Sequence, residues 1–437
     1  MTPMPAGLKD HALRRELTSE VHARPFMLLQ PPERATHLAL ITDEHAADAD
    51  RARVAVLCER FGAEQPADDA SYHMAEFPEF RLRWERHTEF STYTFLAAEP
   101  VPAARFSSPV IERVPKDWRD TLPGKVLVAV HVEVEPQDSA ELDPEELPRI
   151  LGTDNFAGAQ VSGGAANAFM NFSMLDDGYG RLLLRHRRLK PRQAGRLLQR
   201  LLEIETYRMM ALLALPLARQ YSGALSAAES RLTAVTNRMT ELKELEDERA
   251  LLGELTELSS EVERVQAATA YRFGAARAYF ELVGRRIEEL REERIEGYQT
   301  FQEFFGRRLT PAMRTCEAVG IRIADLSRRV TRVGQLLRTR VDVQLEAQNR
   351  DLLESMDRRV KLQTRLQETV EGFSVVAISY YLVSLIGYAA KSLKSSGLSL
   401  DPAVVMGISI PVVALLVWFG VRRLRKLATR SVEKREN

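Results

Sequence analysis

Two uncharged stretches near the C-terminus constrain this 437-residue chain more than any other feature. Residues 372–390 and 403–421 each run for 19 residues without Asp, Glu, Lys or Arg. As a helix, each would be about 28 Å long, which is close to the thickness of the hydrocarbon core of a bilayer. A pair of buried core helices is the alternative. Two such stretches in tandem, followed directly by a basic tail, favour a C-terminal transmembrane hairpin.

The basic residues around this hairpin predict its orientation. Seven Lys and Arg residues lie in the tail at 422–437 and four lie at 358–365, whereas the connecting loop at 391–402 holds only Lys391 and Lys394. Cytoplasmic loops of membrane proteins carry an excess of Lys and Arg. We therefore expect both termini in the cytoplasm and the loop outside, with no cleavable signal peptide at the N-terminus.

Proline usage divides the rest of the chain. Sixteen of the 20 prolines lie in residues 1–191, whereas residues 217–401 contain only Pro311. Because proline costs about 3 kcal/mol in a helix interior, the second region predicts long helices. We expect an α+β domain at residues 1–190 and a helical stalk at 191–371. The elements expected in the first domain are a helix at 51–61, strands at 36–41, 80–84, 90–95 and 125–134, and two strands within 160–185 joined by the turn at 176–180.

Two features organise the predicted stalk. Pro311 predicts a turn between two helices, with Thr310 as the N-cap and Pro311 as the first helical residue. Further on, apolar residues from Val341 to Phe373 recur mostly at spacings of three, four or seven. Such spacing is typical of a coiled-coil or bundle seam. This seam leads directly into the first uncharged stretch.

Composition and motifs exclude several function classes. The 61 basic residues equal the 61 acidic residues in number, so no net field favours nucleic acid. Cys58 and Cys316 lack zinc-ligand spacing, and the eight histidines form no H-E-x-x-H motif. The Gly-rich segment at 162–167 is followed by a strand-like sequence, so it offers no helix N-terminus to a phosphate. We expect no catalytic residue, no metal site, no cofactor and no nucleic-acid partner.

Two polar clusters are candidates for ligand binding. His22 and Arg24 lie in EVHARPF, and Arg86 and His87 lie in RWERHTEF between two expected strands. The two arginines could hold a carboxylate or phosphate, and a histidine could carry a proton that is exchanged near neutral pH. The favoured alternative is structural: these side chains pair with nearby glutamates and fasten the N-terminal segment to the sheet.

A polar stripe marks the first uncharged stretch. Ser374, Tyr381, Ser384 and Tyr388 are spaced by seven, three and four residues and fall on one side of a helix. Because polar groups are costly in lipid, we expect this stripe to face protein or water. It could line a pore or, as we favour, pack against another helix where Ser384 and Gly387 permit close approach.

The segments EVHARPF, RWERHTEFSTYTF and VEGFSVVAISYYLVSLIGY resemble a bacterial family of predicted membrane-anchored proteins, domain of unknown function (DUF) 3422. The resemblance runs over essentially the whole chain. It implies a multi-pass protein of the bacterial inner membrane and supplies no activity.

A second resemblance is architectural. An N-terminal α/β domain, long helices, two spans and a basic tail are similar to CorA-type magnesium channels, which are pentamers with a Gly-Met-Asn motif at the outer end of the first span. The nearest counterpart here is Gly387-Tyr388-Ala389, so the motif is absent. The arrangement of domain and spans still resembles that of the CorA-type channels, but selectivity for magnesium is not expected.

The expected function is that of a non-enzymatic membrane anchor. We expect an oligomeric scaffold or sensor whose partners are the lipid bilayer and other copies of the same chain. The alternative is an ion channel or transporter of the CorA-like shape. The sequence does not name a ligand or an ion.

Overall fold

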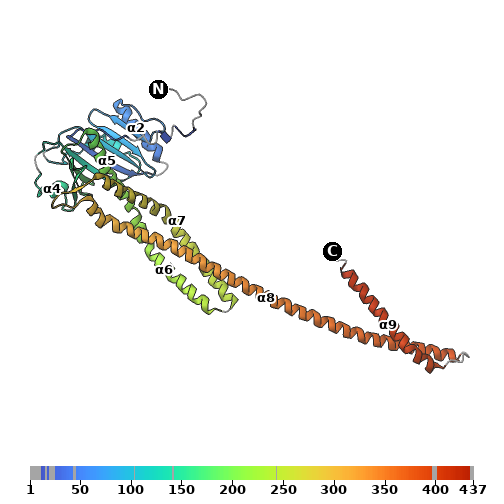
Figure 1. The fold of residues 1–437 in the computed structure, drawn as a ribbon. Coiled ribbons are helices and arrows are strands. Elements are labelled where there is room, and N and C mark those ends of the chain that lie inside the picture. The colour runs from blue at the N-terminus through green and yellow to red at the C-terminus, as the bar shows by residue number, and fades with distance from the viewer. Residues whose placement is uncertain are drawn as a thin grey trace. The chain divides into compact units, whose positions relative to one another are not determined.

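The computed structural model describes residues 11–14, 17–18, 25–42, 46–102, 104–139, 142–242, 244–395 and 401–433. The chain forms two compact units (Figure 1). The N-terminal unit comprises residues 1–241 and 253–334, and the C-terminal unit comprises residues 242–252 and 335–437. The N-terminal unit therefore contains helices that the sequence-based division assigned to a separate stalk beginning at residue 191.

A nine-stranded mixed sheet forms the centre of the N-terminal unit, with the order β2-β3-β4-β1-β5-β8-β7-β6-β9. Among the described strands, only β5 and β8 pair in parallel. The strands are β1 Glu33–Ile41, β2 Tyr72–Glu76, β3 Arg81–Arg86, β4 Phe90–Ala97, β5 Lys125–Glu135, β6 Ala157–Val161, β7 Ala166–Met170, β8 Gly180–His186 and β9 Glu293–Arg294. This is an α/β domain with a mixed sheet.

The strands predicted from short apolar runs and from alternating apolar and polar residues are confirmed. The runs at 36–41, 80–84, 90–95 and 125–134 lie within β1, β3, β4 and β5, apart from Phe80, which directly precedes β3. The two strands expected within 160–185 are β7 and β8. The Gly-rich segment at 162–165 forms the turn from β6 into β7, so no helix follows it. Strands β2, β6 and β9 were not predicted; they have five, five and two residues.

The helices are α2 Ala46–Phe61, α3 Lys116–Arg119, α4 Leu147–Leu151, α5 Pro191–Leu212, α6 Ala214–Glu241, α7 Leu245–Leu290, α8 Phe301–Ser395 and α9 Pro402–Glu433, with a 3-10 turn at Val110–Arg113. Helix α2 covers one face of the sheet, where Val54 and Leu57 pack with Trp84, Tyr93 and Phe95. Helix α5 lies on the opposite face, and its Thr206 reaches His37 of β1. The predicted helix at 51–61 lies within α2.

The predicted turn at Pro311 is wrong, because α8 continues through this proline. The break between α7 and α8 lies at residues 291–300, where Arg291 and Gly297 have φ values of 46° and 86°. Glu292 then accepts hydrogen bonds from the backbone N–H groups of Phe301 and Gln302, at 2.8 and 2.9 Å. Thr300 and Glu303 complete a capping box. This Thr-x-x-Glu signal starts the helix. Helix α8 continues through Pro311 although the proline removes one backbone hydrogen bond.

In the C-terminal unit, Glu248 at the start of α7 is buried and pairs with Arg340 of α8, with Nε 2.5 Å from Oε1. Gln344 donates to the same oxygen at 3.2 Å. Val341 is buried and Leu345 is half-buried, but the apolar residues of the predicted seam beyond Leu345 are exposed within the single chain. They include Leu352, Met356, Val360, Leu366, Val370 and Phe373. The described part of this chain therefore supplies no partner helix for the seam.

Candidate functional site

The sheet face beneath α5 is polar over three neighbouring strands. Because side chains alternate along a strand, Leu82 and Trp84 of β3 enter the core under α2, whereas Arg83 and Glu85 project to the other face. Thr92 and Thr94 of β4, and His37 of β1, lie on that same face. All five side chains are buried. Polar groups lose their water on burial, so a folded protein must supply partners for them.

These residues line a cavity of about 230 Å³ between the sheet and the helices. Helix α5 contributes Gln199, Leu202, Glu203, Thr206 and Tyr207 to its walls, and α7 contributes Arg286. His87 and Phe90, from the turn between β3 and β4 and the first residue of β4, complete the lining. The two rings stack with centroids 4.4 Å apart. The cavity thus combines charged, hydroxyl and aromatic groups.

His37 fixes the floor of this cavity. Its Nδ1 lies 2.8 Å from Thr94 Oγ1 and its Nε2 lies 3.2 Å from Thr206 Oγ1. Thr206 donates its own hydroxyl proton to the carbonyl of Leu202 at 2.9 Å, so it accepts from His37 Nε2–H. Thr94 then donates to Nδ1. Burial, followed by the charge of Arg83, lowers the pKa of His37 to about 3, so the ring is neutral at pH 7.

Two ion pairs stand in the walls of the cavity. Arg83 donates from Nη2 to Glu85 Oε1 at 2.7 Å within β3, and its Nε has no hydrogen-bond partner in the described part of the chain. Arg286 of α7 donates to Glu203 of α5 and also contacts Glu289 at 3.1 Å. Burial acts to lower the pKa of Arg286, but the charges of Glu203 and Glu289 outweigh it, and the pKa is raised. The cavity therefore presents both signs of charge.

The structure separates the predicted site residues. His87 lines the cavity, whereas Arg86 alternates with Glu85 and lies on the α2 side. There burial raises the pKa of Asp50, and the charge of Arg86 offsets part of that rise. His22 and Arg24 lie outside the described residues. Glu89 accepts hydrogen bonds from Arg272 and from Tyr279 Oη, the latter at 2.9 Å, and so ties the β3–β4 turn to α7.

The described residues after EVHAR are fastened to α5. The ring of Phe26 lies 4.9 Å from the guanidinium carbon of Arg196. Leu29 N–H donates to the carbonyl of Pro191 at 3.2 Å. A Cβ on Gly195 would come within 1.7 Å of the carbonyl oxygen of Met27, so the glycine permits this close approach. These contacts join the segment to α5, whereas the expected pairing of His22 and Arg24 with glutamates falls outside the described residues.

Sequence spacing alone could not assemble this cavity. His37, Thr206 and Arg286 are separated by up to 249 positions and meet only through the fold. One signal was available in RWER and FSTYTF, where Arg83, Glu85, Thr92 and Thr94 alternate with large apolar residues. That pattern predicts a polar sheet face, and it does not reveal that helices cover it.

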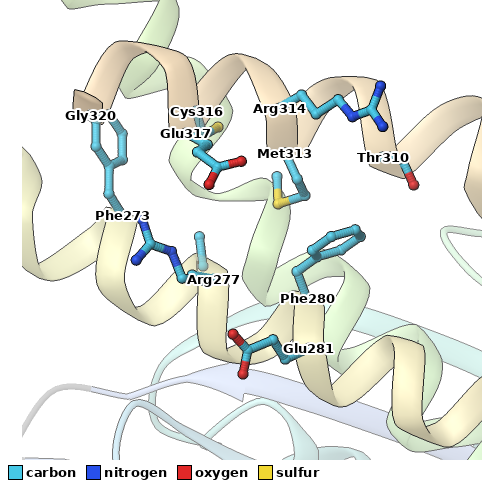
Figure 2. A pocket seen from close by; sticks show the side chains of 11 residues that line it. Phe273, Arg277, Phe280, Glu281, Thr310, Met313, Arg314, Cys316, Glu317 and Gly320 are labelled. Atoms are coloured by element: carbon cyan, nitrogen blue, oxygen red, sulfur yellow. The ribbon is translucent and has the colours of Figure 1, made fainter. Parts of the chain in front are cut away.

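A second hollow lies in the N-terminal unit between α7 and α8, with a volume of about 410 Å³ (Figure 2). Phe273 and Phe280 face Met313 and Cys316 across it, and charged side chains such as Arg277 stand beside them. Burial raises the pKa of the Cys316 thiol, so it is not a thiolate at neutral pH. The groove offers no activated nucleophile, and the polar cavity is the better candidate site.

The described residues contain no cluster of three or more His, Cys, Asp or Glu side chains arranged to hold a metal ion. Burial raises the pKa of Glu133 on β5 to about 7, although the N–H of Phe106 donates to its Oε1 at 2.6 Å. Its other oxygen has no partner among the residues that the structure describes. Glu133 is not among the residues that line the polar cavity.

Two helices of the C-terminal unit contain segments long and apolar enough to cross a membrane, namely the last part of α8 and residues 402–423 of α9. Gly387 of α8 lies against α9, where an added Cβ would meet the sulfur of Met406 at 2.3 Å. Tyr381 and Tyr388 of the predicted stripe are exposed, and Ser384 is half-buried. Ser374 donates to the carbonyl of Val370 in its own helix at 2.9 Å.

Comparisons with known proteins give one family. A family model described as protein of unknown function (DUF3422) matches residues 9–428. No curated protein and no solved structure matches the chain. The family match covers nearly the whole sequence and carries no activity with it. The chain therefore belongs to this family of proteins of unknown function.

Proposed function

We propose that this protein is a non-enzymatic scaffold or sensor anchored in the bacterial inner membrane by the hairpin of α8 and α9. The observation that carries the proposal is the exposure of apolar side chains on both helices. In the most apolar 18-residue segment of each helix, only 11% is buried within the chain in α8 and 6% in α9. Phe373 is 72% exposed and Leu416 is 68% exposed. Water disfavours such a surface, whereas the hydrocarbon of a bilayer solvates it.

The charge pattern supports an orientation for this anchor. Lys and Arg are concentrated at 358–365 and 422–437 and are sparse at 391–402. By the positive-inside rule, both termini lie in the cytoplasm and the connecting loop lies outside. The polar cavity of the N-terminal unit is then a cytoplasmic site, as a sensor of an internal solute requires.

Self-association is the second part of the proposal. The seam from Leu352 to Val370 is apolar and uncovered in the single chain, and Tyr381 and Tyr388 are likewise exposed. Polar groups in a membrane are stabilised by partners on other helices. A second copy of the chain would cover both surfaces with the same contacts in each protomer.

Membrane fractionation tests the anchor. The full chain should remain in the pellet after extraction with alkaline carbonate and enter solution only with detergent. A variant lacking residues 372–437 should lose this resistance. As a matched control, a variant lacking only residues 424–437 keeps both apolar segments and should stay in the pellet. Release of the full chain by carbonate alone would contradict the proposal.

An ion channel of the CorA-like shape is the second candidate function. It is favoured by α8, a single helix of 95 residues that begins in the N-terminal unit and includes the first apolar segment. In this alternative, the stripe at Ser374, Tyr381, Ser384 and Tyr388 lines a pore around an oligomer axis. Reconstitution into vesicles decides: cation flux that stops when Ser384 is replaced by Leu would favour the channel over the scaffold.

A further inference from the structure

The cavity beneath α5 has the features of a ligand site beyond its role in packing. Burying a polar sheet face is costly unless every group is satisfied. An apolar face of the kind found under α2 would close this half of the sheet without that cost. Here Arg83 is only 5% exposed, its Nε has no partner in the described part of the chain, and the space in front of the strands is open.

The charge of the lining restricts the ligand. Arg83 and Arg286 contribute two positive charges, and Glu85 and Glu203 contribute two negative charges. A lone anion would compete with the glutamates for the two arginines, and a lone cation would compete with the arginines for the glutamates. A ligand that carries both charges can exchange each ion pair for an equivalent one. Because burial between Thr94 and Thr206 keeps His37 neutral, the ring adds no charge to this balance.

The volume restricts the ligand further. The volume of the cavity is about 230 Å³. It lies below the range of about 300–1,000 Å³ typical of sites for drug-sized molecules. Phe90, Tyr207 and Leu202 add apolar surface beside the charged groups. The cavity therefore suits a short stem that bears two opposite charges close together.

We propose that the cavity between β1, β3, β4 and α5 binds a small zwitterion of the α-amino acid class. Arg83 and Arg286 receive its carboxylate, and Glu85 and Glu203 receive its ammonium group. The rings of Phe90 and Tyr207 cover its side chain. This site lies wholly within the N-terminal unit, so its occupancy does not depend on the proposed membrane anchor.

Thermal unfolding of the full chain in detergent micelles tests the site. The probes are the 20 standard amino acids, each at 10 mM, with inorganic phosphate, citrate, spermidine and glucose as comparison compounds. At least one amino acid should raise the melting temperature. The α-hydroxy acid and the decarboxylated amine corresponding to that amino acid should not raise it, because each lacks one of the two charges.

Variants separate binding from folding. Arg83→Gln and Glu203→Gln should each weaken binding of the active amino acid at least tenfold by calorimetric titration. Glu203 is more exposed than Arg83, so its variant keeps the test open if Arg83→Gln does not fold. Arg322→Gln is the matched control, because it breaks a comparable ion pair with Glu229 outside the cavity.

Three results would overturn the proposal. One is stabilisation by phosphate, citrate, spermidine or glucose without any response to amino acids. Another is the absence of a response to every amino acid. The third is equal weakening by Arg322→Gln and Glu203→Gln. Each result is independent of membrane extraction, so failure of this site and failure of the anchor are distinguishable.

Discussion

The two units of this chain place their side chains in opposite ways with respect to water. In the N-terminal unit, Trp84 and Tyr93 are fully buried, and even the charged Arg83 is removed from solvent. In the C-terminal unit, Phe373 and Tyr388 of α8 are 72% and 70% exposed. One unit hides polar groups, and the other displays apolar groups. The first unit covers its own apolar side chains, whereas the second leaves those of α8 and α9 uncovered in the single chain.

The two units differ in the interactions that stabilise them. Buried polar groups stabilise a fold only when hydrogen bonds replace the lost water, as Thr94 and Thr206 do for His37. Exposed apolar side chains contribute no stabilisation until lipid or another protein surface removes them from water. Changes in the N-terminal unit should therefore alter its free energy of unfolding, whereas changes on the exposed face of α8 should alter association.

The largest expected change in stability concerns His37. Its pKa is lowered from 6.5 to about 3, so between these values the unfolded state binds more protons than the folded state. Stability is full above pH 6.5 and falls as the pH falls, by about 5 kcal/mol at most. In His37→Gln, about 3 kcal/mol of the loss between pH 7 and 4.5 should disappear. Urea unfolding of the wild type and of His37→Gln at pH 7 and pH 4.5 measures this difference. Equal losses of unfolding free energy in the two proteins would contradict the claim that His37 is buried and neutral.

Glu133 should act in the opposite direction. Its pKa is raised from 4.5 to about 7 by burial, so the folded state binds more protons than the unfolded state between these values. Its contribution is present below pH 4.5 and is lost as the pH rises through 7, by about 3 kcal/mol at most. The free energy of unfolding of Glu133→Gln should rise relative to that of the wild type between pH 5 and 8. If the difference in free energy of unfolding between variant and wild type stayed constant over that range, the Glu133 carboxyl would be ionised throughout.

Gly195 tests the close packing of the N-terminal unit. Gly195→Ala would drive a methyl group into the carbonyl oxygen of Met27, and should lower the free energy of unfolding by about 1–3 kcal/mol. Gly223 of α6 is the matched control, since nothing lies within 4 Å of an added Cβ there. Gly223→Ala should stabilise by about 0.5–1 kcal/mol. Equal effects of the two variants would contradict the tight contact between residues 25–30 and α5.

The exposed stripe of α8 should show the smallest change in stability and a clear change in association. Single cysteines at 374, 381, 384 and 388, in a background without Cys58 and Cys316, should alter the free energy of unfolding by less than about 0.5 kcal/mol. Positions 381 and 388 should form oxidative cross-links between copies and resist water-soluble thiol reagents. Rapid modification at 381 and 384 that also blocks ion flux would favour a pore over a packing surface.

The sequence reveals periodic features better than sites. Strands such as 125–134 were predictable because local alternation specifies them. The cavity was not predictable, since Arg83, His37 and Arg286 are distant in sequence and only the fold brings α5 and α7 over the sheet. The turn was misplaced at Pro311 because a proline is conspicuous, whereas the capping pair Thr300 and Glu303 carried the true signal.

The sidedness of the hairpin tests the membrane anchor most directly. Paired reporters, one active only in the cytoplasm and one only outside it, can be placed before residue 1, after Ser396 and after Asn437. We predict a cytoplasmic signal at both ends of the chain and an external signal after Ser396. A cytoplasmic signal at Ser396 would contradict the transmembrane hairpin and leave the exposed apolar faces of α8 and α9 to be covered by protein.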